Sequence, residues 1–397
     1  MRRWIFLLLI FKQNIGLTAD PNQSAEASQI ETSGYMSLRS LRNESGDGSS
    51  ANLLSGTALL KSKLKLDNDL LKIQLRPLLT HATNTSVSEA SAYVDELYWE
   101  RRLSPSSFTF LGRRKIVNGV AIGRNPSDFF NQSKLQDRTL TDDDRRAEIE
   151  GDDMMGWSYF GQSYSLQSLL AAPDRDSKRI RAMLQVNGNL NSLSTDISFI
   201  AYYADRPSLG MNLSTVLGEN VTAYAEAALR KGRDRQSPLL SRNEVVVGVA
   251  EDDNRWITDV VIGGQYTTGG GITLTAEYWR NNNGFSDKEY AGIANSLTSG
   301  QGNPRLAGTL LSTPGLRKNS AFVRIGDIPL FDALKCEITW IRNLDDSSSF
   351  VRGALNWDIS KADGFRIGID GFYGSKLSEY GSSKIDRRIF FIYKRFF

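Results

Sequence analysis

The chain ends on RRIFFIYKRFF, residues 387–397, and this stretch decides the fold. Counting back from the last residue by twos gives a row that is aromatic and apolar with one exception: Phe397, Arg395, Tyr393, Phe391 and Ile389. Period two is the side-chain repeat of a β-strand, in which successive residues point to opposite faces. A strand of about ten residues is long enough to cross a membrane at a tilt. The stretch therefore predicts a terminal β-strand with one apolar face.

The same alternation recurs along the chain. Apolar residues alternate with charged or polar ones in four further stretches, around residues 71–76, 179–187, 351–359 and 365–373. A soluble β-sandwich and a membrane barrel both alternate in this way, but the barrel places its apolar face outward and its polar face inward. No Pro- or Ser-rich linker divides the chain into sandwich-sized domains. We therefore predict an all-β fold, a transmembrane antiparallel up-and-down β-barrel.

The alternation predicts about 18 strands, within a range of 16–18, each of about ten residues. The predicted strands cover residues 31–41, 52–66, 69–80, 90–103, 107–116, 155–169, 178–190, 194–205, 209–217, 220–231, 242–252, 255–268, 271–281, 318–327, 334–344, 348–359, 363–374 and 387–397. The segment 90–103 also has the pattern of an amphipathic helix.

The lengths of the predicted connections alternate along the chain. Long polar connections follow odd-numbered strands, at 42–51, 81–89, 117–154, 282–317 and 375–386, and the tightest turns follow even-numbered strands. Three connections break the rule: 170–177 and 232–241 are even but long, and 218–219 is odd but short. Short turns at one end and long loops at the other are typical of outer-membrane barrels. We expect 117–154 and 282–317 to be long external loops.

The N-terminus has the order of an export signal. A basic head at Met1–Arg3 precedes an unbroken apolar run at Trp4–Phe11, which is too short to span a bilayer. A cut after Ala19 or after Ala27 would suit a signal peptidase, so the cleavage site is left open. The alternative is a first buried strand of a cytosolic protein. We predict a signal peptide over residues 1–27 and a single barrel over residues 28–397.

Composition excludes several classes of protein. No apolar run of about 18 residues occurs, which excludes a polytopic helical membrane protein. The net charge of +3 is too small for a nucleic-acid binder. Cys336 and His81 are the only Cys and His residues, so we expect no disulfide, no metal site, no cofactor and no catalytic site. A barrel lipase would need a His paired with a Ser, and His81 offers no such motif.

Two stretches resemble known outer-membrane proteins. The terminal strand ending on Phe397 resembles the assembly signal that bacterial outer-membrane barrels present to their insertion machinery, and Arg395 departs from that pattern. Residues 93–130, YVDELYWERRLSPSSFTFLGRRKIVNGVAIGRNPSDFF, resemble the hairpin and inward-leading loop of large porin-like barrels, including alginate-export-type channels. The resemblance implies a passive conduit of the bacterial outer membrane. The implied partners are outer-membrane lipid, the barrel assembly machinery and a hydrophilic solute.

Charged residues that alternate with apolar ones would line the channel of such a barrel. The predicted cationic lining is Lys61, Lys63, Lys65, Lys72, Arg76, Arg179, Arg181, Arg324, Arg352 and Arg366. The predicted acidic lining includes Glu226, Glu244, Asp259, Glu277, Glu337, Asp358 and Asp370. The excess of cations favours anions, because a low-dielectric wall focuses their field into the pore. The alternative is that lumenal charges of both signs pair with one another.

The acidic segment 117–154 is a candidate constriction. Its acids Asp128, Asp142, Asp143 and Asp144 would face cationic wall residues if the segment folds into the lumen. A solvated external loop is the alternative interpretation, and a calcium site is a third interpretation, for which the expected spacing and Gly hinge are missing.

We therefore predict a passive channel for small or polymeric hydrophilic solutes. A sealed structural or adhesive barrel that binds a partner through its loops is the alternative, and oligomeric association is left open.

Aromatic rings near the predicted strand ends are candidates for the girdles at the membrane interfaces. They are Trp99, Trp157, Trp256, Trp279, Trp340, Tyr278, Tyr373 and Tyr393. Cys336 alternates in phase with Leu334 and Ile338, which predicts that its small side chain faces lipid.

Overall fold

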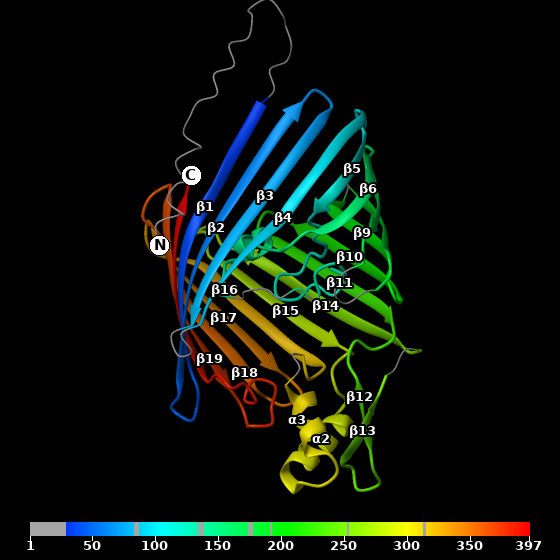
Figure 1. The fold of residues 1–397 in the computed structure, drawn as a ribbon, viewed down its shortest axis with the longest axis vertical. Helices are drawn as coiled ribbons and strands as arrows, with labels where there is room; N and C mark the ends of the chain where they lie inside the picture. The colour runs from blue at the N-terminus through cyan, green and yellow to red at the C-terminus, as the bar shows by residue number, and fades with distance from the viewer. Residues whose placement is uncertain are drawn as a thin grey trace, which may run out of the picture.

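The computed structural model describes residues 29–82, 87–132, 134, 139–173, 178–190, 193–251, 254–312 and 315–397. Eighteen antiparallel strands form one closed sheet, which Figure 1 shows as a barrel with tilted strands. The predicted fold class and strand number are confirmed. The predicted signal peptide lies outside the described residues. Among the described residues, no helix is both long enough and apolar enough to cross a membrane.

The barrel strands follow one another around the wall in chain order. They are β1 (Gln29–Glu44), β2 (Ser50–Leu66), β3 (Asp69–Ala82), β4 (Val87–Ser104), β5 (Ser107–Arg114), β6 (Asp152–Phe160), β7 (Tyr164–Ala171), β8 (Arg181–Leu190), β9 (Thr195–Tyr203), β10 (Pro207–Leu217), β11 (Val221–Lys231), β14 (Trp256–Thr267), β15 (Thr273–Asn281), β16 (Asn319–Phe331), β17 (Leu334–Asn343), β18 (Ser349–Asp358), β19 (Asp363–Tyr373) and β20 (Arg387–Phe396). The candidate helix at 90–103 is part of strand β4.

The C-terminal stretch closes the barrel. Strand β20 pairs with β19 on one side and with β1 on the other, from Tyr35 opposite Phe396 to Glu44 opposite Arg387. Closure matters because an open sheet edge leaves backbone N–H and C=O groups without partners, which hydrocarbon cannot supply. The first residues of β1, up to Ser33, pair with β2 alone, so β1 and β2 rise beyond the end of β20 (Figure 1).

Two strand predictions were wrong, and the errors cancel in the total. The segment 155–169 contains parts of two strands, β6 and β7, joined by a turn at 161–163. The segment 242–252 forms no barrel strand; it contains β13 (Val246–Ala250), which pairs with β12 (Ser237–Leu240) in a separate two-stranded sheet. The Val-rich composition of 245–249 predicts a strand correctly, but β-propensity does not identify the strand's partner.

The corrected strands resolve the three exceptions in the connection pattern. Splitting 155–169 moves the next connections by one place, so 172–180 and 232–255 become odd and 218–220 becomes even. Every even connection is then five residues or shorter, and all the long loops are odd; the odd connections 45–49, 83–86, 204–206 and 344–348 are short as well. We call the two barrel ends the short-turn end and the long-loop end. In Figure 1 the short-turn end is uppermost.

The outer face of the wall is apolar and the inner face is polar. On β1, Leu38 points outward with 56% of its surface exposed, whereas its neighbours Ser37 and Arg39 point inward and are buried. Cys336 faces outward between Ile328 and Leu355, in agreement with its predicted orientation. Exposed aromatic rings lie near both strand ends on the outer face. Trp279 is an exception to the predicted girdle, because it points inward and is 8% exposed.

A small module stands beyond the barrel at the long-loop end (Figure 1). It consists of the β12–β13 hairpin and two helices, α2 (Asp287–Ser299) and α3 (Pro304–Leu311). Helix α2 begins with a capping box in which Ser286 and Glu289 satisfy each other's backbone N–H groups. Val246, Phe285 and Ile293 belong to its buried apolar cluster. The connection predicted at 282–317 as an external loop is thus a folded part of this module.

Candidate pore and its inner segment

The connection between β5 and β6, residues 115–151, runs inside the barrel over its described part, and we call it the inner segment. Figure 1 shows it within the outline of the wall, and its described contacts are mainly with inward-facing side chains. It carries the short helix α1 (Asp142–Ala147), whose N-terminus is capped by Thr141. The inner segment contacts the wall in three areas, described in turn below.

The first area is held by an inward-facing acid of β11. Glu226 accepts hydrogen bonds from the backbone N–H groups of Val120 (3.0 Å), Ala121 (3.3 Å) and Ser127 (2.8 Å). It also accepts one from the Ser127 hydroxyl at 2.9 Å. Glu226 is fully buried. A buried carboxylate is costly unless its oxygens are hydrogen-bonded, and here the inner segment supplies the donors.

Acids of two neighbouring strands extend this contact. Glu277 on β15 accepts from the backbone N–H groups of Ile122 (2.7 Å) and Gly123 (3.2 Å), and Asp259 on β14 pairs with Arg124 at 3.2 Å. A Cβ atom at Gly123 would lie 2.3 Å from the Trp279 ring, so this close approach requires glycine. We call Glu226, Glu277 and Asp259 the carboxylate anchor.

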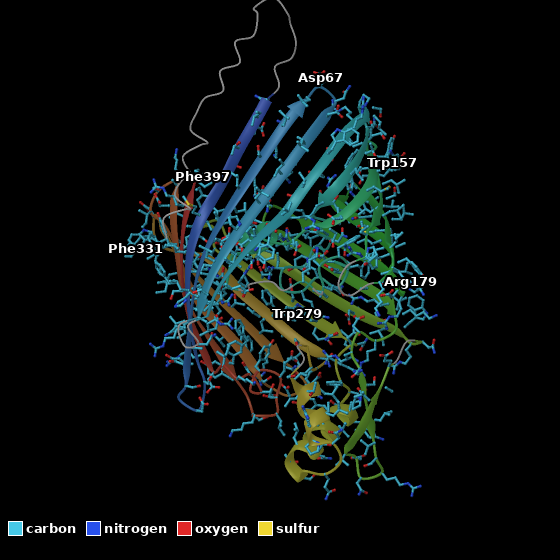
Figure 2. The ribbon with its side chains drawn as sticks, viewed as in Figure 1. Asp67, Trp157, Arg179, Trp279, Phe331 and Phe397 are labelled. Carbon is cyan, nitrogen blue, oxygen red and sulfur yellow. The ribbon has the colours of Figure 1, made fainter. Side chains whose placement is uncertain are left out.

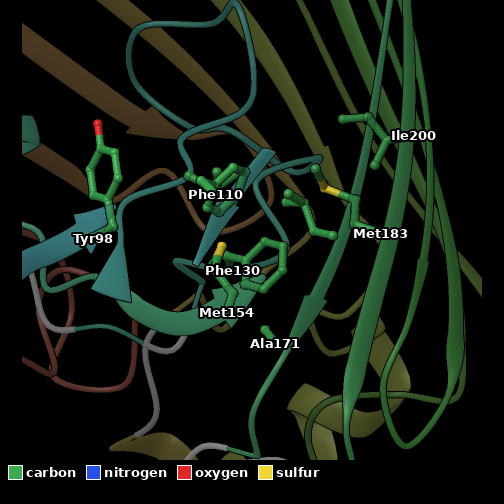
Figure 3. Close-up of a cluster of buried hydrophobic side chains, with 9 residues drawn as sticks. Tyr98, Phe110, Phe130, Met154, Ala171, Met183 and Ile200 are labelled. Carbon is green, nitrogen blue, oxygen red and sulfur yellow. The ribbon is translucent and has the colours of Figure 1, made fainter. Parts of the chain in front are cut away.

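The second area is apolar and lies on the β5–β9 side of the lumen. Phe130 of the inner segment belongs to one buried cluster with inward-facing Phe110, Met183 and Ile200 (Figure 3). Phe129 stacks on Tyr202 with ring centroids 5.2 Å apart. Burial of a phenylalanine side chain contributes about 2 to 3 kcal/mol, so these two rings fix the segment firmly on this side.

The third area reverses the charges of the first. Asp142 of α1 pairs with Arg324 on β16 at 2.6 Å, and Asp144 pairs with Lys394 on β20. Just beyond α1, Glu148 pairs with Arg39 on β1 and accepts from the Tyr35 hydroxyl at 2.7 Å. We call Arg324, Lys394 and Arg39 the cation anchor. The inner segment thus binds wall acids through its backbone on one side and wall cations through its carboxylates on the other.

Most predicted lining cations face inward, and several form ion pairs within the wall. Arg76 makes two bonds to Asp95, at 2.9 and 3.0 Å, and Arg352 makes two to Asp370, at 2.7 and 2.8 Å. The other described wall pairs are Lys72 with Glu96 at 2.7 Å, Arg181 with Asp152 at 3.0 Å and Arg366 with Glu337 at 3.2 Å. Pairing of lumenal charges, the alternative left open by the sequence, describes these five positions.

Three predicted lysines lie at the short-turn rim. Lys61, Lys63 and Lys65 point inward from the part of β2 that rises towards the turn at 67–68. Lys65 pairs with Glu31 at 2.6 Å in an exposed position, whereas Lys61 is half-buried and Lys63 is exposed.

Three other predicted positions differ from expectation. Arg179 lies in the exposed connection before β8, so it is not a wall residue (Figure 2). Glu244 lies in the turn between β12 and β13, outside the barrel. The Arg179 error follows from a strand boundary, because alternation continues past the point where pairing stops. The Glu244 error follows from assigning the separate β12–β13 hairpin to the barrel wall. Asp143 is exposed on α1, unlike its neighbours Asp142 and Asp144.

Asp128 lies within the inner segment and does not reach a wall cation. Its carboxylate accepts from the Asn118 backbone N–H at 3.2 Å and from the Asn131 side-chain amide at 2.9 Å. Burial raises its pKa to about 7, against these hydrogen bonds, which favour the charged form. Nearby charges act in opposite directions: Glu226 raises the pKa further and Lys134 lowers it. Asp128 therefore titrates near neutral pH.

Sequence reasoning identified the orientation of the carboxylate anchor and missed its role. Alternation marked Glu226, Asp259 and Glu277 as inward-facing, but the segment that they hold lies more than 90 residues away along the chain: backbone N–H groups bind Glu226 and Glu277, and the Arg124 side chain binds Asp259. A sequence signal exists on β11, VTAYAEAALRK, where one acid stands among small apolar residues. Such an acid requires compensating donors, although the pattern does not say which segment provides them.

Comparison with known proteins identifies solved structures that share the fold of this chain. No protein-family model and no curated protein sequence matches the chain. Solved structures match over nearly the whole length. They include OccAB1 of Acinetobacter baumannii, with 10% identity, 93% of this chain and 96% of that chain covered and a TM-score of 0.56. OccK1 (OpdK) of Pseudomonas aeruginosa has 10% identity, coverage of 93% and 98% and a TM-score of 0.57.

A third match is the outer membrane protein OprD of Pseudomonas aeruginosa, with 10% identity, coverage of 94% and 96% and a TM-score of 0.55. This chain has the fold of these outer-membrane porins. The predicted porin-type barrel is thereby confirmed, and the expected outer-membrane localisation agrees with it. Identity of about a tenth carries no residue roles from those proteins to this one. The similarity to alginate-export channels in particular stays a prediction.

Proposed function

We propose that this barrel is a passive channel of the bacterial outer membrane for small hydrophilic solutes. The observation that carries the proposal is a closed 18-stranded wall whose inner face is polar and whose inner segment is fastened to that face on both sides. A barrel of this size encloses an aqueous lumen unless loops fill it. A fastened inner segment narrows the path, which favours small solutes over the polymers that the sequence had left open.

We further propose a modest preference for anions. Most wall cations are neutralised by neighbouring acids, but Lys61 and Lys63 form no ion pair within the described part of the chain and face inward at the short-turn rim. Fixed cations at a pore mouth raise the local concentration of anions. A related observation is that OpdK has been crystallised with vanillate, a carboxylate, although identity of 11% transfers no site.

Purified protein in planar bilayers tests both proposals. We expect discrete conductance steps and a reversal potential in a salt gradient that shows anions passing at least as well as cations. Neutralising the pair, Lys61→Gln with Lys63→Gln, should shift the reversal potential towards cations. The matched control is Lys361→Gln, an exposed lysine in a turn at the same end, which should leave it unchanged. Equal shifts in both variants would contradict the role of the inward-facing lysines.

A sealed structural or adhesive barrel is the second candidate. It is favoured by the three apolar clusters that the inner segment forms with inward-facing residues, around Phe130, Ala121 and Leu140. The folded module at the long-loop end would then present the binding surface. Absence of any conductance from a correctly folded barrel would support this candidate and reject the channel.

Three further expectations belong with the proposed function. We propose residues 1–27 as a cleaved export signal and β20 as the strand by which the assembly machinery recognises the barrel. Outer-membrane lipid is the proposed surrounding of the apolar outer wall. We propose no catalytic role and no cofactor for the lumen.

A further inference from the structure

The outward-facing charges of the barrel are distributed unequally between its two ends. Among the described strand residues, pairing register assigns the outward face at each strand end, leaving aside the irregular β16 bulge. At the short-turn end the outward charges are Arg101, Arg395, Asp69 and Asp363. At the long-loop end they are Arg42, Arg113, Lys231, Arg280, Arg342, Arg387, Glu44 and Asp153.

The short-turn end is balanced and the long-loop end is basic. At the short-turn end Asp363 pairs with Arg395 at 3.6 Å, and Asp69 with Arg101 at 4.0 Å. At the long-loop end the two acids cannot neutralise six cations. Charged side chains on the outer wall are unfavourable within hydrocarbon but tolerated near the interfaces, so an unbalanced set needs anions at that interface.

The basic side chains lie one step beyond the aromatic girdle of the long-loop end. Tyr278 and Trp340 are exposed on the outer face, and Arg280 and Arg342 follow them by two residues on β15 and β17. Two residues along a strand correspond to about 7 Å. Tyrosine and tryptophan rings prefer the headgroup level, so the guanidinium groups reach the depth of lipid phosphates.

One site on this rim is defined in detail. Arg387 on β20 and Arg42 on β1 both bond to Glu44, at 2.8 and 3.0 Å, which holds the two guanidinium groups side by side while each remains more than half exposed. A hollow of about 400 Å³ adjoins Arg387 on the outer wall. Its lining includes apolar Val351 and Ile369 and, between them, Gly353.

The shape of the hollow follows from its glycines. Gly353 faces outward in register with Ile338 and Ile369, where a larger side chain would fill the space, and nothing lies within 4 Å of its absent Cβ. The hollow therefore offers the Arg387 guanidinium at one side, with that of Arg42 beside it, and an apolar floor at the other. Three acids also line it: Glu44 pairs with both arginines, Asp370 is buried and pairs with Arg352, and Asp386 adds a further negative charge. The Arg387 and Arg42 side chains stay 56% and 57% exposed, so their remaining donors are accessible.

We infer that the long-loop rim of the outer wall binds the phosphate-bearing headgroups of lipids, with the hollow beside Arg387 as the principal site. The phosphate binds the guanidinium groups of Arg387 and Arg42, because arginine forms paired hydrogen bonds with phosphate oxygens. The start of an acyl chain lies over Gly353. Long loops face outward in bacterial barrels, so the partner is a phosphorylated lipid of the outer leaflet. The inference does not depend on conduction, since a sealed barrel would have the same rim.

Binding of lipid A, a glycolipid with two phosphates, to the full barrel in neutral detergent tests the inference. We expect Arg387→Gln with Arg42→Gln, and separately Gly353→Leu, each to weaken lipid binding about tenfold. The matched control is Arg395→Gln on the same strand at the short-turn end, and it should bind like the wild type. Circular dichroism and the heat-dependent gel shift of each variant verify folding.

Two comparisons distinguish the lipid from a free anion. Dephosphorylated lipid A should bind at least tenfold more weakly than lipid A, and inorganic phosphate should not compete at millimolar concentration. The inference is overturned if the wild type does not bind lipid A, if Arg395→Gln weakens binding as much as the rim variants, or if dephosphorylated lipid binds equally well. Competition by inorganic phosphate would overturn the lipid assignment in favour of a simple anion site.

Discussion

The inner segment is fastened to the barrel at two places that use opposite charges. At the carboxylate anchor, Glu226 and Glu277 accept hydrogen bonds from backbone N–H groups of the segment. At the cation anchor, Arg324 and Lys394 receive carboxylates of α1. Burial also differs between Glu226, which is fully buried, and the Arg324–Asp142 pair, whose side chains are 19% and 31% exposed. The Arg39 and Lys394 side chains of the cation anchor are more buried than this pair, at 6% and 9% exposed.

This difference in burial predicts that the two contacts contribute unequally to the free energy that holds the inner segment on the wall. A buried carboxylate that satisfies several backbone donors leaves all of them without partners when it is removed, at about 1 to 3 kcal/mol for each orphaned group. A partly exposed ion pair contributes about 1 kcal/mol or less, because water screens both charges. The carboxylate anchor should therefore hold residues 118–127 more strongly than the Arg324–Asp142 pair holds α1.

The largest expected effect comes from removing the carboxylate anchor. Glu226→Ala orphans three backbone N–H groups, so we expect local opening of residues 118–127 to become about 3 kcal/mol easier, roughly a hundredfold. The rate of hydrogen exchange at the Val120 and Ala121 amides measures this local opening. Single-channel conductance should become larger or noisier in the same variant.

A control separates this effect from general destabilisation of the wall. Asp358→Ala removes an acid at the end of β18, at the short-turn end, and should leave exchange at residues 118–127 unchanged. Loss of protection in both variants would mean that the segment responds to the stability of the barrel as a whole. Unchanged protection in Glu226→Ala would show that the apolar contacts of Phe129 and Phe130 suffice.

A smaller effect should follow from pH at Asp128. Burial raises its pKa to about 7, so the packed state is favoured when the carboxyl is neutral; this contribution is complete below about pH 4 and is lost as pH rises through 7. Opening of the neighbouring backbone should therefore increase about tenfold between pH 6 and pH 8, after correction for intrinsic exchange. Asp128→Asn should abolish the pH dependence. A pH dependence that persists in this variant would assign it to another group.

The smallest expected effect belongs to the cation anchor. Arg324→Gln should make opening of α1 about fivefold easier, corresponding to about 1 kcal/mol, and should leave residues 118–127 protected. A double-mutant cycle with Asp142→Asn measures the coupling directly. High salt should mimic the single variant, because it screens the exposed pair. A coupling of 3 kcal/mol or more would show that this contact is as strong as a buried pair and would remove the contrast between the two anchors.

Several features could be predicted from local pattern. The alternation of 387–397 predicted the strand that closes the barrel, and the orientation of Cys336 and of the three anchor acids followed from the same period. The division of 155–169 into β6 and β7 was missed because the turn between them is only three residues long, at 161–163, and apolar residues lie on both sides of it. The separate β12–β13 sheet was missed because a Val-rich stretch predicts a strand without indicating its neighbours.

The sequence by itself determined the chemistry of each face, since a period of two sorts side chains between lipid and lumen whatever the partners of a strand are. Only the tertiary structure decided which lumenal charges meet, because Asp142 and Arg324 are separated by 182 residues and lie close together only in the folded barrel. The unequal charge of the two outer rims likewise became visible once register had assigned each residue to an end. Pairing across the barrel is a long-range property, and no local pattern encodes it.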